Sequence, residues 1–373
     1  GAAVKDLIID ASNITGNQYT GAVAGYSEGS VTDCQAGKKV KVEGAVYTGG
    51  LIGCSTAPLS SLRNQGTVTG GYSNTGGIAG YLMASGKALL DCQNEGEVTG
   101  KDKTGGIVGA FLSNTGDSAT ALDCSNKGTV EGQGYNAGGI AGLVSGGNNA
   151  VTIEKCSNLG TVKGSGVNGG IAGILDSKKV TVIKCNNDGE VTGSGAGGIV
   201  GNNQGRISDC YNSGSIEAKQ DGGGIAAYQQ EGDGVIVKCY NEGTVTATSC
   251  AGGITGTNET YIDNSYNSGK VRGDSSIGGI AGKNTGTIDN VYGAGTVTGE
   301  TAKGSIVGRN NGYITNSYWL DRSASLGVGL EDNAGRKQGV RKVTHEELSG
   351  QKKISVTEGF TMLIDVMNSS ANS

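Results

Sequence analysis

The chain has 373 residues, of which 72 are Gly, one is Pro and 5% are aromatic, and its formal net charge is −5. Collagen is excluded because it needs Gly at every third position and abundant Pro. A flexible linker is excluded because Ile and Val recur at fixed places between the glycines. No basic stripe favours nucleic acid binding, and no apolar run is long enough to span a bilayer, so we expect no direct membrane insertion.

The first residues are apolar and prone to form strands: Val4, Leu7, Ile8 and Ile9. We expect them to form part of a first, incomplete coil. The chain begins at Gly1 without a signal peptide, and we expect it to be a segment of a longer protein.

A Gly-Gly-Ile-Ala-Gly string then recurs, most clearly at residues 76–80 and 138–142. Its second residue falls at positions 22, 50, 77, 106, 139, 170, 198, 224, 253, 279 and 305, which are eleven copies spaced 26 to 33 residues apart. Most copies are followed by Ile-x-x-Cys-x-Asn-x-Gly-x-Val-x-Gly or a variant of it, as in residues 153–164. Length varies mainly around the turns, as in residues 113–121 and 146–150, where a repeat fold tolerates insertions.

This period predicts an all-β fold, a parallel β-helix or β-solenoid of about eleven coils with three short strands per coil. β-branched residues dominate the three apolar pieces of each unit, and none of these pieces is long enough for an ordinary helix. One unit buries too little to fold alone, so stacked units must share a core. With about 4.8 Å between coils, eleven coils predict a rod on the order of 50 Å long. We expect right-handed winding from the bias of strand crossovers.

Equivalent residues should stack in columns along the rod. One inward column is predicted at Val68, Val98, Val130, Val162, Val191, Ile216, Val245, Val271 and Val297. A second joins Cys34, Cys92, Cys124, Cys156, Cys185, Cys210 and Cys239, followed by Ser265, Val291 and Ser317. A third holds Asn64, Asn94, Asn126, Asn158, Asn187, Asn212, Asn241 and Asn267, whose amides can bond from coil to coil. The Gly two residues after each Asn should take a positive φ or lie under a close neighbour.

The nine cysteines are best read as small core residues. Seven fall at one repeat position, where neighbouring Cβ vectors would be parallel and therefore unsuited to a disulfide. No Cys-x-x-Cys pair exists, so we expect no metal, and Cys54 and Cys250 lie off the column in distant coils. The column should consist of buried free thiols.

The sequence shows no evident catalytic residues and no evident cofactor-binding motif, and we expect no enzyme activity and no cofactor. The single histidine, His345, lies beyond the repeats in a helix-capping pattern. The glycine strings lack the Gly-Lys-Ser/Thr of a phosphate-binding loop. A β-helix enzyme acting on acidic polysaccharides needs a dense cluster of carboxylates with Arg or Lys. The position before Cys instead alternates in sign, which favours a solvated ladder, at Asp33, Asp91, Asp123, Lys155, Lys184, Asp209 and Lys238.

Aromatic residues follow the Cys position in the last five coils, and Trp319 follows the last of them. The predicted strip comprises Tyr211, Tyr240, Tyr266, Tyr292, Tyr318 and Trp319. Such a strip either stabilises this half of the rod by stacking or binds sugar rings or a partner protein. It is the candidate ligand-binding site of the sequence.

The repeat period stops near Trp319. We therefore divide the chain into a solenoid over residues 1–319 and a C-terminal cap or extension over residues 320–373. Residues 320–342 are Gly-rich and irregular, residues 344–348 predict a short helix, and residues 359–367 predict a second helix or a strand. A solenoid end needs such a cap because its strand edges are otherwise unpaired.

The repeated Gly-Gly-Ile-Ala-Gly string resembles the GLUG motif, which is named for Gly-Leu-hydrophobic-Gly, with Ile here in the Leu place. The resemblance covers residues 20–318. Arrays of this kind occur in large secreted or wall-anchored bacterial proteins, some adhesin-like and some accompanying immunoglobulin A1-cleaving metallopeptidases.

The resemblance implies a non-enzymatic structural or adhesive module of a bacterial surface protein, extracellular, secreted or in the cell wall. A host glycan or protein is the expected partner. Two alternatives remain open: a carbohydrate-active β-helix enzyme, and an accessory region of a surface metallopeptidase whose catalytic domain lies elsewhere. The peptidase zinc motif is absent from this sequence.

Overall fold

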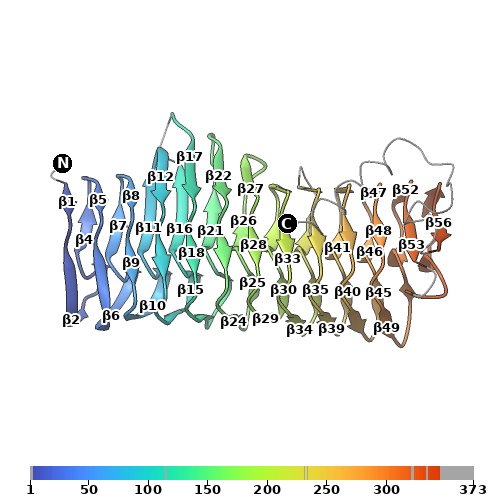
Figure 1. The fold of residues 1–373 in the computed structure, drawn as a ribbon, viewed down its shortest axis with the longest axis horizontal. Coiled ribbons are helices and arrows are strands. Elements are labelled where there is room, and N and C mark those ends of the chain that lie inside the picture. The colour runs from blue at the N-terminus through green and yellow to red at the C-terminus, as the bar shows by residue number, and fades with distance from the viewer. Residues whose placement is uncertain are drawn as a thin grey trace.

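The protein forms an elongated stack of flat coils, in which every strand pairs in parallel with its equivalent in the next coil (Figure 1). The computed structural model describes residues 3–113, 116–230, 232, 234–320, 323–332 and 335–344. Strands of three sheets, here called A, B and C, alternate along the chain, and no helix occurs among the described residues. The predicted β-solenoid of about eleven coils with three faces is confirmed. The hand of the winding stays a prediction.

Sheet A carries the apolar residues that precede the Cys position. Its 13 strands, in spatial order, are β1 (Val4–Lys5), β5 (Val31–Thr32), β8 (Leu59–Ser60), β12 (Gly86–Leu90), β17 (Ala119–Leu122), β22 (Val151–Glu154), β27 (Val180–Ile183), β32 (Arg206–Ser208), β37 (Val235–Val237), β42 (Tyr261–Asp263), β47 (Thr287–Asp289), β52 (Tyr313–Thr315) and β55 (Arg336–Gln338).

The strands of sheet C begin at the Ala position of the Gly-Gly-Ile-Ala-Gly strings. Its 12 strands are β4 (Ala24–Ser27), β7 (Ile52–Ser55), β11 (Ala79–Ala84), β16 (Val108–Ser113), β21 (Ala141–Ser145), β26 (Ala172–Leu175), β31 (Val200–Asn203), β36 (Ala226–Gln229), β41 (Thr255–Asn258), β46 (Ala281–Asn284), β51 (Val307–Asn310) and β54 (Val328–Glu331). β11, β12 and β16 are longer than most equivalent strands and lie where the stack of coils is tallest in the view of Figure 1.

Sheet B has 31 strands because each coil contributes up to three short pieces to it. The first coils hold β2 (Ile8–Thr15), β3 (Gln18–Thr20), β6 (Gln35–Gly49), β9 (Arg63–Asn64) and β10 (Thr67–Gly76). The pieces at the Asn position are β13 (Gln93–Asn94), β18 (Ser125–Asn126), β23 (Ser157–Asn158), β28 (Asn186–Asn187), β33 (Tyr211–Asn212), β38 (Tyr240–Asn241), β43 (Tyr266–Asn267), β48 (Tyr292–Gly293), β53 (Tyr318–Leu320) and β56 (Arg341–Val343).

The other pieces of sheet B lie at the Val position and before the Gly-Gly pair. At the Val position are β14 (Val98–Gly100), β19 (Val130–Gly132), β24 (Val162–Gly164), β29 (Val191–Gly193), β34 (Ile216–Ala218), β39 (Val245–Ala247), β44 (Val271–Gly273) and β49 (Val297–Gly299). Before Gly-Gly are β15 (Asp102–Gly105), β20 (Ala137–Gly138), β25 (Val167–Gly169), β30 (Gly195–Gly197), β35 (Asp221–Gly223), β40 (Cys250–Gly252), β45 (Ser276–Gly278) and β50 (Lys303–Gly304).

The predicted Val column is confirmed, since Val68 pairs in register with Val98 and the column continues through Val297. All its members are buried. From Val130 on it forms a small hydrophobic cluster with Ala137, Ala196, Ala251 and Ile277, separate from the main core that sheets A and C enclose.

The asparagine column forms a continuous chain of amide hydrogen bonds. Asn158 Nδ2 donates to Asn187 Oδ1 at 2.7 Å, and Asn158 Oδ1 accepts from Asn126 Nδ2 at 2.8 Å. The same bond joins each neighbouring pair from Asn64 to Asn267, and all eight side chains are fully buried. The coil-to-coil amide bonding expected from the sequence is therefore confirmed.

The glycines of the repeat are fixed by close packing. A Cβ on Gly139 would lie 2.1 Å from Gly170 O and 2.4 Å from Asn158 Oδ1. A Cβ on Gly160, which follows Asn158 by two residues, would lie 2.0 Å from Gly128 O. Of the two explanations for this Gly, the close neighbour is correct, because Gly160 does not have a positive φ.

The left-handed backbone occurs instead at the residue before the Cys column and its continuation. These residues have φ between 44° and 54°: Asp33, Asp91, Asp123, Lys155, Lys184, Asp209, Lys238, Asn264, Asn290 and Asn316. They turn the chain from sheet A into sheet B. Asp and Asn tolerate this conformation better than most residues. The column therefore forms the turn between the two sheets, a role that the charges of its side chains do not indicate.

Strand pairing continues beyond the point where the repeat sequence fades. Strands β54, β55 and β56 pair in parallel with β51, β52 and β53, so all three sheets extend to Val343. The segment 320–342 was expected to be irregular, but its described part therefore contains a further coil. The predicted elements at 344–348 and 359–367 lie outside the described residues, apart from Thr344. At the other end, β1, β2 and β3 form the expected incomplete first coil.

Candidate functional site

The predicted tyrosines form one column on the outer side of sheet B. Tyr211, Tyr240, Tyr266, Tyr292 and Tyr318 are consecutive partners in the parallel register. Stacked rings join Tyr211 to Tyr240 and Tyr240 to Tyr266, with centroids 5.1 Å apart in both cases and planes within 8° and 2° of parallel. Stacking of this kind stabilises neighbouring coils.

The column is not an open strip along its whole length. Tyr211 and Tyr240 are half-buried, whereas Tyr266, Tyr292 and Tyr318 are only 5%, 1% and 6% exposed. The three buried rings form a small cluster with Leu320 and Val343. Burial also raises the pKa of the Tyr240 hydroxyl above its ordinary value. Of the five rings, mainly those of Tyr211 and Tyr240 retain accessible surface. Ligand binding by these two rings stays a prediction.

Trp319 does not continue this strip, which corrects the sequence expectation. Neighbouring residues of a strand face opposite sides of a sheet, so the residue after Tyr318 faces inward. Trp319 pairs with Gly293, which pairs with Asn267, and it therefore takes the position of the asparagine column. Its ring packs partly buried against the main core and against Gly327. Trp319 therefore packs against the core near the C-terminal end of the rod and lies on the opposite side of the sheet from the tyrosine column.

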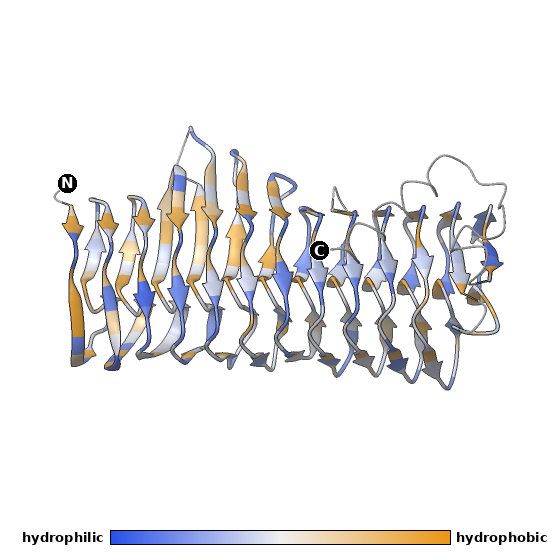
Figure 2. Cartoon of the chain, viewed as in Figure 1, coloured by the Kyte–Doolittle hydropathy of each residue, from blue (hydrophilic) through white to orange (hydrophobic). Residues whose placement is uncertain are grey.

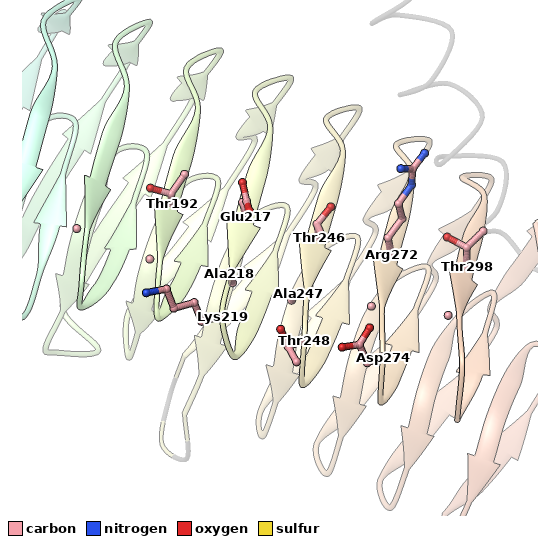
Figure 3. A pocket seen from close by; sticks show the side chains of 14 residues that line it. Thr192, Glu217, Ala218, Lys219, Thr246, Ala247, Thr248, Arg272, Asp274 and Thr298 are labelled. Atoms are coloured by element: carbon pink, nitrogen blue, oxygen red, sulfur yellow. The ribbon is translucent and has the colours of Figure 1, made fainter.

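A groove on sheet B was not recognised from the sequence. It has a volume of about 680 Å³ and crosses several coils between β24 and β49. One wall is the row Thr192, Glu217, Thr246, Arg272 and Thr298, which are consecutive partners in register. Lys219, Thr248 and Asp274 form a second row at the following turn, and Gly193, Ala218, Ala247, Gly273 and Gly299 lie between the two (Figure 3).

The small residues make the groove concave, and packing keeps them small. A Cβ on Gly273 would lie 2.4 Å from Ala247 O, and one on Gly193 would lie 2.6 Å from Gly195 O. The sequence did hold a signal for this site. Successive residues of a strand face opposite sides of the sheet. Because the Val of each Val-x-Gly string faces the interior, the residue after it faces outward.

A second group of tyrosines was also missed, at the N-terminal end of the rod. Tyr19 and Tyr47 stack with centroids 5.2 Å apart, Tyr26 lies edge-on to Tyr19, and Tyr81 lies edge-on to Tyr47. Tyr19 and Tyr47 both have a φ of 52°, which is unusual for bulky residues. Tyr19 and Tyr26 are 41% and 49% exposed. The repeated Tyr-Thr-Gly at residues 19–21 and 47–49 was the available signal.

The cysteine column consists of buried free thiols, as expected. All nine cysteines are free, and only Cys250 is partly exposed. Each column thiol donates to the carbonyl two residues earlier, as Cys185 does to Ile183 O at 3.3 Å. Cys185 Sγ also accepts the Cys156 N–H at 3.4 Å, and burial raises the pKa of the Cys185 thiol well above its ordinary value. Burial and a raised pKa suit the Cys185 thiol to hydrogen bonding inside the rod and not to nucleophilic chemistry.

Cys250 lies beside a buried carboxyl group in sheet B. Asp221 is the register partner of Cys250, and its Oδ2 accepts from the Thr257 hydroxyl at 3.0 Å. Burial raises the pKa of Asp221 and of Cys250, and it raises the pKa of Tyr228 nearby to about 12. Within the described residues, no group of three or more His, Cys, Asp or Glu has an arrangement suited to a metal ion.

None of the described residues forms a helix long and apolar enough to cross a membrane. Comparison with known proteins adds one finding about the repeat: residues 192–217 match the family model of the GLUG motif. The matched segment begins at the groove residue Thr192, ends at the groove residue Glu217 and spans one coil, from β29 to β34. No curated protein and no solved structure matches the chain significantly. The match confirms the resemblance stated from the sequence.

Proposed function

We propose that this GLUG-motif repeat protein is a non-enzymatic, extracellular structural or adhesive module of a larger bacterial surface protein. The observation that carries the proposal is the continuous parallel strand pairing of all three sheets along the described rod. Sheet A contains 13 strands, so twelve spacings of about 4.8 Å give a length of about 58 Å. Because each coil pairs with its neighbours in all three sheets, the unit suits a stiff spacer.

Burial of the thiols supports an extracellular setting. Free cysteines are uncommon in exported proteins, because oxidants convert accessible thiols to disulfides or sulfenic acids. The seven cysteines of the column are at most 1% exposed, and Cys54 is 6% exposed. Oxidants therefore have direct access mainly to Cys250 in the folded chain.

Location on the cell surface can be tested with antibodies raised against the purified chain. We expect them to label intact cells of the source bacterium, and external protease to remove that label before any cytoplasmic marker is degraded. Labelling that appears only after permeabilisation would contradict the proposal. The sequence that flanks this segment in the full-length protein tests the alternative of an accessory region of a metallopeptidase. A zinc-peptidase motif in that flanking sequence would favour the alternative.

The groove favours one second candidate, a carbohydrate-active enzyme, because it contains the carboxylates of Glu217 and Asp274 beside Arg272 and Lys219. Glycoside cleavage needs one carboxyl group to act as an acid and the other as a nucleophile or base. Purified chain incubated with acidic polysaccharides should release no new reducing ends or unsaturated products. Products that disappear in Glu217→Gln would establish the enzyme instead.

A further inference from the structure

We infer that the groove on sheet B binds a linear oligosaccharide that carries a carboxylate group. This inference rests on the proposed function, in that it names the ligand class for lateral binding by the rod. The groove residues come from six successive coils, from Gly164 to Gly299, and seven of their eight polar side chains are exposed: Glu217, Lys219, Thr246, Thr248, Arg272, Asp274 and Thr298.

The arrangement of charges distinguishes this groove from the rest of the same column. In earlier coils, Glu131 and Lys163 are register partners and form an ion pair of 2.9 Å. In the groove, Thr246 separates Glu217 from Arg272, so the two charges are two coils apart. Among the residues that the structure describes, no ion pair occupies Glu217, Lys219, Arg272 or Asp274. Their hydrogen-bonding capacity is available to a ligand.

The groups in the groove match the chemistry of an acidic sugar chain. The guanidinium of Arg272 presents a planar set of donors that fits a carboxylate with two parallel hydrogen bonds. The carboxylates of Glu217 and Asp274 accept hydrogen bonds from sugar hydroxyls, and the threonine hydroxyls both donate and accept. Gly193, Ala218, Ala247 and Gly273 let sugar rings approach the backbone closely.

Other polymers fit less well. A nucleic acid needs an excess of positive charge, whereas this groove balances Lys219 and Arg272 against Glu217 and Asp274. An extended peptide binds by adding to a free strand edge, but the strands below the groove are paired on both sides. Four coil spacings from Thr192 to Thr298 give a site about 19 Å long, which accommodates several sugar rings in a row.

The test is an array of oligosaccharides built from galacturonate, glucuronate, mannuronate or sialic acid, each printed beside its carboxyl-reduced counterpart. We expect the full chain to bind at least one acidic member and to bind its reduced counterpart at least tenfold more weakly. Arg272→Ala should weaken that binding by about tenfold or more, since a hydrogen-bonded charge contributes about 1.5–3 kcal/mol. Titration calorimetry of the purified variants with the selected oligosaccharide gives the fold-change.

Two matched controls locate the site. Lys163→Ala removes a cation from the same column outside the groove, and Tyr26→Ala removes an exposed ring from the N-terminal aromatic group. Both should bind as the unaltered chain does, and circular dichroism should show the same fold for all three variants. Equal losses in Arg272→Ala and Lys163→Ala, a loss only in Tyr26→Ala, or no binding to any acidic member would overturn the inference. None of these outcomes alters the antibody test of surface location.

Discussion

The side-chain amide of each ladder asparagine bonds in two directions. Asn158 Nδ2 donates both to Gly160 O at 2.8 Å and to Asn187 Oδ1, so one side chain holds its own turn and the next coil. A buried amide without such partners would be strongly unfavourable. Because Gly139 packs directly against this amide, the Gly-Gly string and the Asn position are two parts of one contact.

Gly139→Ala should therefore be strongly destabilising. Its Cβ would overlap Gly170 O and displace the Asn158 amide, and we expect a loss of about 3 kcal/mol from overpacking and broken hydrogen bonds. Gly71→Ala is the matched control, since the nearest atoms to its Cβ lie 3.7 Å away, and it should change stability by less than about 0.5 kcal/mol. Urea unfolding followed by circular dichroism measures both, and equal midpoints would contradict the packing argument.

The buried thiols predict a loss of stability in alkaline solution. Burial raises the pKa of Cys54 from 9.0 to about 11, so the fold retains a proton that the unfolded chain releases. The contribution of this group is fully present below pH 9 and is lost as the pH rises to about 11. The thermal midpoint, measured with reductant, should fall across this range. Cys54→Ser removes one titrating thiol and should make the fall of the thermal midpoint with pH shallower. An unchanged slope would mean that other groups cause the fall.

At the scale of the strand, the inward column at the end of sheet C changes character halfway along the rod. Leu82, Phe111, Val144 and Leu175 occupy it first, and Asn203, Gln229, Asn258, Asn284 and Asn310 follow. The change is visible where the strands of sheet C turn from apolar to polar after β26 (Figure 2). Asn203 donates to Gln229 at 2.9 Å and Asn258 to Asn284 at 2.7 Å, so these side chains form a second buried amide ladder.

A complete coil should be removable without loss of the fold. Deletion of residues 198–223 joins Gly197 to Gly224, preserves the Gly-Gly string and leaves each remaining coil with an equivalent neighbour. We expect a folded chain, shorter by about 4.8 Å, because solenoid stability is approximately a sum over coils and their interfaces. Deletion of residues 198–210 is the control, since it brings non-equivalent strands together and should unfold that region. Circular dichroism and small-angle scattering distinguish the two.

At the scale of the molecule, the chain is one rod whose two halves differ. The N-terminal coils carry the apolar column of sheet C and the tyrosine group around Tyr19 and Tyr47, whereas the C-terminal coils carry most of the groove, the second amide ladder and the buried tyrosines. Binding and rigidity therefore need not come from the same coils. The groove lies over the small Val and Ala cluster, which supports its floor from within.

Small-angle scattering of the purified chain should show an elongated particle. The described coils predict a long dimension of about 58 Å or more. The cross-section should stay constant as the salt concentration is raised, because hydrogen-bonded ladders and apolar packing hold the stack together, not surface ion pairs. A compact, globular distance distribution would contradict the solenoid.

The sequence by itself determined the repeat, the strand pattern and the Val, Cys and Asn columns, because each depends on a period that composition and spacing display directly. Only the tertiary structure decided which outer positions are accessible. Tyr292 and Tyr318 are buried in a cluster with Leu320 and Val343, whose sequence carries no repeat signal, and the inward position of Trp319 follows from strand pleating. The separation of the groove charges depends on Thr246 lying between Glu217 and Arg272 in the stack, and such a relation exists only once the coils are stacked in register.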